Sequence, residues 1–382
     1  MKSKPKLKIG LVLDESLDPP DGVQQYVLRV GEWLSAQGHS VYYLVGETKR
    51  RDQQYIYSLT RNIKVAYNGN RLSIPLPVLT SKIQQLLNEL QLDIIHVQAP
   101  YSPFLAGKII RCASVTTAVV GTFHILPYNR LAIAGSKLLA AINHRTARRF
   151  DAMMAVSEPA AEFARQVFGL TSTVVPNPFD FQKFHNDKKA RLPTGTTDIV
   201  FLGRLVERKG GLLLLKAINA IVQKHLTEVP FRVTIAGKGP DYDKMQAFIG
   251  RNNLGAVVTM PGFIAEEDKP TLLGSADVAV FPSISGESFG ISLLEAMAAA
   301  RGVVLAGNNP GYAAVMENKE QLIQPQDVTQ FSQTVAEWLN NPAARAQAAA
   351  RQKEYVQQFD IAEVGPQILA IYNKALQTRH PS

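Results

Sequence analysis

The chain has 382 residues, of which 46% are hydrophobic and 19% are charged, and a formal net charge of +9. This length predicts two domains, and the composition provides ample apolar material for two buried cores. A single cysteine, Cys112, excludes a disulfide framework and favours a reducing compartment. The first apolar run, 9–13, ends at Asp14 and is too short for a signal peptide. No segment approaches the ~20 apolar residues of a membrane span, so we expect a cytoplasmic protein.

The excess positive charge lies in the first half of the chain. Residues 1–190 contain 23 Lys and Arg against 14 Asp and Glu, whereas residues 191–382 contain 18 of each. A basic solvated surface is one explanation. The other is an anionic partner such as an acidic lipid surface, which would make the protein peripheral at the inner membrane. Nucleic acid is disfavoured because no basic-aromatic groove or known reader motif is present.

Apolar strand-like runs alternate with amphipathic, helix-like stretches along the chain. In the first half the strand-like runs are 7–13, 41–45, 94–97, 118–122, 153–156 and 173–175. In the second half they are 199–202, 233–236, 257–260, 278–281 and 303–306. Helical periodicity lies between most of them, for example at 23–37, 211–224 and 329–339. Continuous apolar strands separated by helices predict an α/β fold with two parallel, doubly wound, Rossmann-like sheets.

A polar, proline-bearing stretch at 176–195 separates the two halves and is typical of a linker. We expect an N-terminal domain at 1–177 and a C-terminal domain at 178–359, with 360–382 crossing back to the first. Doubly wound sheets bind ligands beyond the carboxyl ends of their strands. The cleft across which two such domains would face each other is therefore the expected site.

The segment from Gly286 to Glu295 is the most informative in the chain. It follows an apolar strand and enters an Ala-rich helix, which places Glu287 in the loop and Glu295 in the second helical turn. Gly290 frees the backbone at the helix start, where unpaired amides form an anion site. The two carboxylates accept hydrogen bonds from hydroxyl groups. A loop that binds phosphate and hydroxyls suggests a sugar nucleotide.

Cations and glycines follow the first two strands of the second half. Arg204 and Lys209 lie five residues apart at the carboxyl end of strand 199–202, a pattern that suits a diphosphate. Two surface cations capping a loop would give the same pattern. Gly237, Lys238 and Gly239 follow the next strand and let the backbone pass close to a ligand. They do not form a dinucleotide fingerprint, because its third glycine is absent.

Three further positions are candidates because of their place at strand or helix ends. Residues Gly262, Phe263 and Ile264 follow the third strand of the second half, where backbone edges could read a nucleobase; a buried Phe in a loop explains them equally well. His124 ends strand 118–122 on the expected cleft side, although a single His is most often structural. Gly22 allows close approach at the first helix start. The histidines show no metal-ligand spacing, so we predict no metal site.

These motifs stand in the order seen in retaining family 4 glycosyltransferases, which have the GT-B fold. The resemblance rests on Gly203-Arg204, Arg208-Lys209-Gly210, Gly237-Lys238-Gly239 and Gly286-Glu287-Ser288-Phe289-Gly290 through Glu295-Ala296. It implies a C-terminal domain that binds a nucleotide-sugar donor and an N-terminal domain on the acceptor side. The implied catalytic residues are His124, Arg204, Lys209 and Glu287. The implied donor-binding residues are Gly22, Lys238, Gly262, Phe263, Ile264, Phe289, Gly290, Ile291 and Glu295.

The resemblance also implies how these residues divide the donor between them. Arg204 and Lys209 would bind the diphosphate, and Glu295 would bind the ribose hydroxyls. Glu287 and the amides of residues 289–291 would hold the sugar, while residues 262–264 would line the base. His124 would touch the sugar near the reacting centre.

A second resemblance concerns the acceptor. Tyr67-Asn68-Gly69-Asn70-Arg71, with Gln24, resembles the acceptor segment of bacterial phosphatidylinositol mannosyltransferases, which implies Gln24, Tyr67, Asn68 and Arg71 as acceptor-binding residues. The strongly basic helix that follows in those enzymes is missing, because 77–90 has only Lys82. A different helix, 131–150, ends with Arg145, Arg148 and Arg149 on one face. It could lie on an anionic membrane, with a solvated helix as the alternative.

We therefore expect a retaining hexosyltransferase that moves α-mannosyl from GDP-mannose to a hydroxyl acceptor such as a phosphatidylinositol-type lipid. No cofactor is expected to be required, and Mg²⁺ would have no ligand set. The alternatives are a UDP-sugar-dependent transferase acting on a polysaccharide or glycolipid, a GT-B sugar-nucleotide epimerase, and a non-catalytic sugar-nucleotide sensor. A nicotinamide dehydrogenase is disfavoured because no glycine fingerprint follows the first strand.

Overall fold

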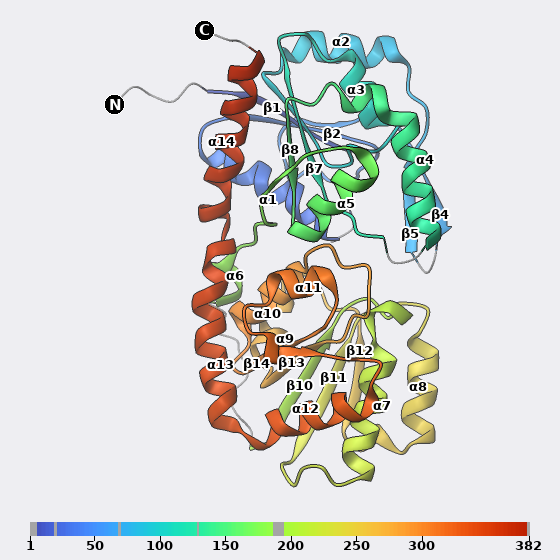
Figure 1. Ribbon diagram of the computed structural model, residues 1–382, viewed down its shortest axis with the longest axis vertical. Coiled ribbons are helices and arrows are strands. Elements are labelled where there is room, and N and C mark those ends of the chain that lie inside the picture. Colours follow the sequence, from blue (N-terminus) through green and yellow to red (C-terminus); the bar gives the residue numbers. More distant parts are fainter. Residues whose placement is uncertain (1–5, 19–20, 68–69, 128–129, 186–194, 380–382) are drawn as a thin grey trace. The chain divides into compact units, whose positions relative to one another are not determined.

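The computed structural model describes residues 6–18, 21–67, 70–127, 130–185 and 195–379; at 64–67, 70–72 and 130 it describes the backbone alone (Figure 1). The chain forms two compact units. Unit 1 comprises Met1–Pro178 and Ile361–Ser382, and unit 2 comprises Phe179–Asp360. The chain thus leaves unit 1 after Pro178 and returns to it at Ile361.

Unit 1 is built on a seven-stranded parallel sheet with the order β3-β2-β1-β6-β7-β8-β9. Its strands are β1 (Lys8–Leu13), β2 (Ser40–Val45), β3 (Ile56–Ser58), β6 (Ile94–Val97), β7 (Ala118–Phe123), β8 (Ala152–Ala155) and β9 (Thr173–Val174). β4 (Asn62–Tyr67) and β5 (Asn70–Pro75) form a separate antiparallel hairpin. The strand order reverses between β1 and β6, which makes their carboxyl ends the place where such sheets bind ligands.

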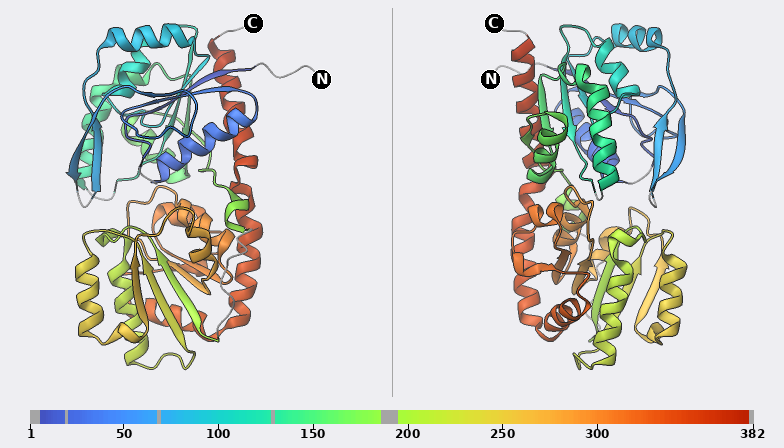
Figure 2. Two further views of the ribbon diagram at one scale, coloured as in Figure 1. Left: turned by 180° about the vertical axis from the view of Figure 1, so that it is seen from behind. Right: turned by 45° about the vertical axis from the view of Figure 1, so that its right-hand side comes forward.

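Helices cover both faces of this sheet. They are α1 (Gly22–Ala36), α2 (Thr80–Leu90), α3 (Leu105–Cys112), α4 (Arg130–Ala147), α5 (Glu158–Phe168) and α14 (Ile361–Arg379). α1 and α14 lie side by side (Figure 2). They share one buried cluster with the strands, which includes Tyr26 and Tyr372, whereas α2 and α3 belong to the cluster that includes Ile83 and Ile109. The last helix of the chain therefore completes the core of unit 1.

Unit 2 has a six-stranded parallel sheet with the order β12-β11-β10-β13-β14-β15. Its strands are β10 (Thr197–Leu202), β11 (Phe231–Ala236), β12 (Val258–Gly262), β13 (Val278–Phe281), β14 (Val303–Gly307) and β15 (Leu322–Ile323). Its helices are α6 (Phe181–His185), α7 (Gly211–Gln223), α8 (Tyr242–Arg251), α9 (Lys269–Gly274), α10 (Ile291–Ala299), α11 (Pro310–Val315), α12 (Val328–Asn340) and α13 (Pro342–Tyr355). Short 3-10 turns are η1 (Glu207–Lys209), η2 (Leu254–Ala256), η3 (Lys319–Gln321) and η4 (Val356–Phe359). The order reverses between β10 and β13, so the loops after these strands flank the corresponding switch point.

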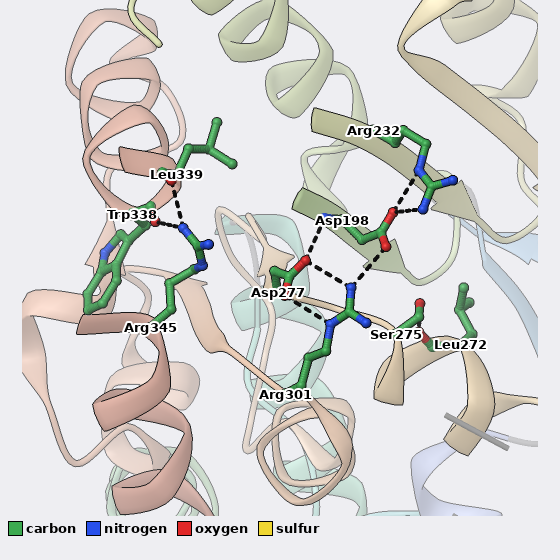
Figure 3. A network of polar contacts seen from close by, with 9 residues as sticks. All are labelled: Asp198, Arg232, Leu272, Ser275, Asp277, Arg301, Trp338, Leu339 and Arg345. Atoms are coloured by element: carbon green, nitrogen blue, oxygen red, sulfur yellow. Dashed lines mark hydrogen bonds and ion pairs between the residues drawn. The ribbon is translucent and has the colours of Figure 1, made fainter. Parts of the chain in front are cut away.

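A charge network fixes the amino-terminal edge of this sheet (Figure 3). Asp198, in β10, accepts hydrogen bonds from Arg232 at 2.7 and 2.9 Å and from Arg301 at 3.1 Å. Arg301 also donates to both carboxylate oxygens of Asp277, at 2.9 and 3.0 Å. Asp277 precedes β13, and its Oδ2 accepts from the Asp198 amide at 2.8 Å. The network joins strand starts, at the end of the sheet opposite to the ligand-binding edge, so it supports the fold.

The predicted α/β fold of two doubly wound sheets is confirmed. Every predicted strand-like run corresponds to a strand, with boundaries that differ by at most two residues. The short edge strands β3 and β15 and the β4–β5 hairpin are not predicted by the periodicity. The predicted linker at 176–195 begins with ordered structure: the Phe179 amide donates to the Phe359 carbonyl at 3.1 Å, and α6 follows.

The predicted basic face of helix 131–150 is wrong in one respect. α4 ends at Ala147, so Arg148 and Arg149 lie beyond the helix. Arg149 donates to two main-chain carbonyls at 2.7 Å each and pairs with Asp151 at 3.2 Å. This side chain therefore holds the turn after α4 against β7 and β8 and does not serve as a membrane-facing cation.

Candidate functional site

The loop between β13 and α10 in unit 2 carries the predicted glutamates. Gly290 precedes α10 with φ +122°, and a Cβ there would lie 2.7 Å from the Tyr312 ring, so only glycine is accommodated. No side chain caps the first turn of α10, so no capping side chain competes with an anion for the amides there. As predicted, Glu287 lies in the loop and Glu295 lies in the second turn.

Glu287 is held by three side chains. Its Oε1 accepts hydrogen bonds from Arg208 Nη1 at 2.6 Å and Ser283 Oγ at 2.7 Å, and it lies 2.9 Å from Lys209 Nζ. Burial favours the neutral acid, but the charges of Lys209 and Arg208 outweigh it and lower the pKa of Glu287 below its usual value. The side chain is therefore a carboxylate, which is suited to accepting hydrogen bonds from hydroxyl groups and poorly suited to taking a proton.

The two predicted diphosphate cations lie beyond the carboxyl end of β10. Lys209 ends η1, and Gly210, with φ +74°, turns the chain into α7. A Cβ at Gly210 would collide with the Pro282 carbonyl, so the turn is pressed against the loop after β13. This close approach brings Lys209 to Glu287. Arg204 lies half-buried in the same loop after β10.

Lys238 and Phe263 are brought together by the loops after β11 and β12. The Gly237 amide donates to the Gly262 carbonyl at 2.7 Å, which ties the two loops. Lys238 Nζ lies 5.2 Å from the centre of the Phe263 ring, and 54% of Phe263 is exposed. A buried Phe is therefore the wrong interpretation here. Exposed aromatic surface beside a cation offers a face on which a planar base could stack, and Ile264 follows it, half-buried.

Glu295 and Phe289 are buried within unit 2. Glu295 is 3% exposed, and Lys269 Nζ lies 3.9 Å from its Oε2 and 2.6 Å from Glu266 Oε2. Phe289 is 4% exposed and packs edge to face on Phe359, with ring centres 5.8 Å apart. Its side chain is thus part of the core. Only the backbone amide of Phe289, next to those of Gly290 and Ile291 at the helix start, is suited to a ligand.

His124 of unit 1 is buried at the carboxyl end of β7, with 7% exposed. Its Nε2 lies 2.9 Å from Gln98 Oε1, and Tyr26 packs against its ring at a centre-to-centre distance of 4.8 Å. Burial lowers the pKa of His124 to about 3, so the imidazole is neutral at pH 7. A neutral ring donates through one nitrogen and accepts through the other.

Gly22 and Gln24 lie at the start of α1. α1 begins at Gly22, and Asp21 occupies the cap position without a side-chain capping bond, so the first amides there are not closed by a side chain. Gln24 is 1% exposed, and its Nε2 donates to Glu15 Oε2 and to the Ser16 carbonyl, both at 3.1 Å. Its Oε1 is buried and has no hydrogen-bond partner in the described structure, so this atom is the one suited to a ligand hydroxyl.

The predicted acceptor segment forms the β4–β5 hairpin. Tyr67 pairs with Asn70, and Ala66 pairs with Arg71, so Tyr67 and Arg71 lie near the end of the hairpin. Asn68 lies outside the described residues. The backbone thus places two of the predicted acceptor residues close to each other.

Three residues of these sites carry no role in the sequence prediction. Arg208 is quoted in the family motif, and its place beside Lys209 is a signal that sequence reasoning could have used. Gln98 directly follows β6, and Ser283 follows β13 after Pro282, and residues just after buried strands place polar side chains at the ligand edge. Their partners are not visible in the sequence pattern.

Other features do not add to the site. Within the residues that the structure describes, no group of three His, Cys, Asp or Glu is placed to hold a metal ion. A cavity of about 720 Å³ lies in unit 2 beside α12 and α13, lined by Met297, Trp338, Arg351 and Tyr355 among others, and it contains none of the predicted site residues. Among the described helices, none has the length and apolarity that a membrane crossing requires.

Two protein-family models match the chain. "Glycosyl transferases group 1" matches residues 182–358, and "Glycosyltransferase Family 4" matches residues 20–183. A similar protein is the phosphatidyl-myo-inositol mannosyltransferase of Mycolicibacterium smegmatis, which is 28% identical over 372 residues, covering 96% of this chain and 93% of the relative. The similarity thus runs through both units.

Solved structures share the fold. A glycosyltransferase from Rickettsia africae matches with a TM-score of 0.77 at 17% identity, covering 98% of this chain and all of that one. Anabaena HepE in complex with UDP-glucose matches with a TM-score of 0.70 at 19% identity, covering 96% and 99%. At these identities the similarity shows a shared fold of two sheets. The ligand of this chain has to be argued from its own residues.

Proposed function

We propose that this chain, which belongs to the glycosyltransferases with the GT-B fold, is a retaining α-mannosyltransferase that uses GDP-mannose and a phosphatidylinositol-type lipid. The observation that carries the proposal is the ionised Glu287, fixed by Lys209 and Arg208 beside the open start of α10. This arrangement offers hydroxyl acceptors and anion donors within one loop. The mannosyl group and the lipid are favoured by the similarity to the mycobacterial relative over most of both chains.

The donor would be divided among the loops of unit 2. Arg204, Lys209 and the first amides of α10 bind the diphosphate, because they supply positive charge and N–H groups. Glu287 accepts hydrogen bonds from the transferred sugar, and Glu295 accepts them from the ribose. Phe263 stacks on the base.

The chemical step breaks the anomeric C–O bond to the diphosphate while the acceptor oxygen forms its bond to the same carbon. The acceptor attacks from the face that the diphosphate leaves, and a phosphate oxygen takes the acceptor proton. Negative charge grows on the leaving oxygen, where Lys209 and Arg204 stabilise it. Glu287 takes no proton in this step, since Lys209 and Arg208 lower its pKa.

The acceptor lipid lies in a membrane, so the enzyme must bind at the cytoplasmic surface of that membrane. Helix α4 of unit 1 has a face that is suited to this binding. Leu131, Leu138 and Ile142 are 77%, 64% and 56% exposed, and their spacing places them on one helix face. Lys137 and Arg145 are exposed on the same helix. Residues 101–150 contain seven Lys and Arg and no Asp or Glu. Peripheral membrane binding combines apolar side chains that insert into the lipid interface with cations that contact lipid phosphates.

The test is transfer to phosphatidylinositol in vesicles, with GDP-mannose and UDP-glucose offered as separate donors. We expect a mannolipid from GDP-mannose with the α-configuration retained, measured by NMR of the product. Glu287→Gln, Arg204→Ala and Lys209→Ala should each reduce the rate by about 100-fold or more, as loss of one preorganised transition-state contact does. Glu337→Gln, an exposed carboxylate on α12, is the matched control and should leave the rate unchanged.

Other outcomes would contradict the proposal in distinct ways. Transfer from UDP-glucose but not from GDP-mannose would show that the donor is a UDP-sugar. Turnover of the sugar nucleotide without an acceptor would indicate an epimerase. Tight donor binding without any turnover would indicate a sensor. A wild-type rate of transfer by Glu287→Gln would contradict the assignment of the β13–α10 loop to the donor sugar.

A further inference from the structure

A buried amide stands beside the candidate histidine of unit 1. β6 and β7 are parallel neighbours, with Val97 opposite Gly121, and the chain reaches Gln98 and His124 at their carboxyl ends. Gln98 Oε1 lies 2.9 Å from His124 Nε2. The two residues are 1% and 7% exposed, so the hydrogen bond between them is shielded from water.

The orientation of this pair decides which nitrogen of His124 carries the proton. The ring is neutral at pH 7, because burial lowers its pKa to about 3. An amide oxygen can only accept, so the His124 Nε2 that faces it must be the protonated nitrogen. Nδ1 then presents a lone pair, and no hydrogen bond to it occurs within the described part of the chain.

The ring is also fixed in direction. Tyr26 packs against it at 4.8 Å with an interplanar angle of 75°. The Tyr26 hydroxyl lies 3.4 Å from Thr122 Oγ1, which in turn lies 2.6 Å from His96 Nε2. Tyr372 of α14 closes this buried chain, with its hydroxyl 2.6 Å from His96 Nδ1. The ring of His124 therefore cannot swing without disturbing a packed polar core.

The nitrogen of the Gln98 amide has no hydrogen-bond partner within the part of the chain that the structure describes. This nitrogen, Nε2, is buried. Leaving a buried donor without an acceptor is unfavourable, so such a donor is retained mainly where it serves a function. The amide whose oxygen faces His124 thus keeps an N–H without an acceptor in the described structure.

We propose that Gln98 is a positioning residue that holds His124 in the Nε2-protonated tautomer, so that Nδ1 is left to accept a hydrogen bond from a hydroxyl of a bound sugar. The identity of the hydroxyl rests on the proposed function, whereas the tautomer does not. His124 then orients the sugar as a neutral acceptor and relays no proton. Gln98 acts through His124 by fixing the role of its Nδ1. This nitrogen can accept a hydrogen bond from a substrate hydroxyl but cannot donate one.

The test reads the tautomer directly, by two-bond proton–nitrogen correlation NMR on the full-length protein with ¹⁵N-labelled histidine. The His124 signals are assigned by their loss in His124→Asn. We expect the wild type at pH 7 to show a protonated Nε2 and a bare Nδ1. Gln98→Glu keeps an oxygen acceptor and should keep the proton on Nε2, whereas Gln98→Leu should lose this preference.

Transfer kinetics form the second arm. We expect Gln98→Leu to lower kcat on the order of 100-fold, the typical effect of losing one preorganised contact, with little change in the KM for the donor. Gln85→Leu, an exposed glutamine on α2, is the matched control and should change neither readout. Thermal melts establish that each variant is folded.

The proposal is overturned by three results. A protonated Nδ1 in the wild type would mean that the Gln98 amide is reversed, with its N–H against His124. An imidazolium at pH 7 would contradict the neutral ring. A Gln98→Leu protein with the wild-type tautomer and the wild-type kcat would show that Gln98 does not position His124. If Gln98→Leu does not fold, the spectra of the wild type and of Gln98→Glu still test the tautomer of His124. These spectra need no substrate, so their result does not depend on the identity of the donor or the acceptor.

Discussion

Asp14, at the carboxyl end of β1, makes the stability of unit 1 depend on pH. It is 5% exposed and accepts hydrogen bonds from the Ala106 amide at 2.6 Å and from the Ser102 hydroxyl. Burial raises its pKa from 3.8 to about 6, although both hydrogen bonds oppose this. Between these two pH values the folded state binds more protons than the unfolded state, so the free energy of unfolding falls as pH rises. The loss reaches at most about 3 kcal/mol.

We predict that Asp14→Asn removes this part of the pH dependence. The amide can still accept from Ala106 and can donate to the Ser102 oxygen, so the contacts are preserved while the titration is lost. Urea unfolding at pH 4.5 and 7.5, followed by Trp33 fluorescence in a Trp338→Phe background, reports on unit 1 alone. The wild type should lose about 2 kcal/mol more than the variant over this range. Equal losses would contradict the assignment, and Asp21→Asn, an exposed carboxyl, serves as the control.

At the residue scale the sequence predicts what a local pattern determines. Gly290, Glu287 and Glu295 are placed correctly because a strand, a loop and a helix start follow one another within fifteen residues. The partners of Glu287 could not be predicted in the same way, since Arg208 lies 79 residues earlier. The contact of Gln98 with His124 spans 26 residues and depends on the pairing of β6 with β7. Long-range contacts of this kind require the strand order, which composition and periodicity do not contain.

At the element scale, the exposed apolar face of α4 is the feature that most needs an explanation. A helix in a globular domain normally turns such a face to the core, and α4 instead packs against α3 and α5 while Leu131, Leu138 and Ile142 remain exposed. The periodicity predicts the helix but not which side is left uncovered. It also misplaces Arg149, because the turn after Ala147 redirects that side chain to main-chain carbonyls.

We predict that Leu138→Ser with Ile142→Ser weakens binding to vesicles containing phosphatidylinositol by about 10-fold or more, because two inserted side chains are lost. Binding is measured by co-sedimentation at 0.1 M salt. The thermal midpoint should not fall, since both side chains are exposed in the folded protein. Val115→Ser, which replaces an 81% exposed side chain elsewhere in unit 1, is the matched control. Wild-type binding by the double variant would show that α4 does not contact the lipid.

At the scale of the whole molecule, the chain path makes unit 1 depend on its last helix. The sequence predicts two sheets because each strand is an apolar run, and it predicts that the last segment, 360–382, crosses back to the first domain. The structure assigns α14 to unit 1, where Val364, Ile368, Leu369 and Tyr372 are buried beside α1. Gly365 lies against the Trp33 ring, where a Cβ would come within 2.7 Å of several ring atoms. Unit 1 is therefore complete only after unit 2 has been synthesised.

We predict that a chain ending at Asp360 leaves unit 2 folded and unit 1 unfolded. Removing four large buried side chains, at about 1.5–3 kcal/mol each, costs about 6–12 kcal/mol, which is comparable to the roughly 5–15 kcal/mol that stabilises a whole domain. Trp33 and Trp338 report on the two units separately in urea titrations. We expect a cooperative transition for Trp338 and none for Trp33. Tyr372→Phe in the full chain, which removes only the hydroxyl bonded to His96, should lower the Trp33 midpoint slightly and keep the transition. A wild-type Trp33 transition in the shortened chain would mean that the core of unit 1 closes without α14.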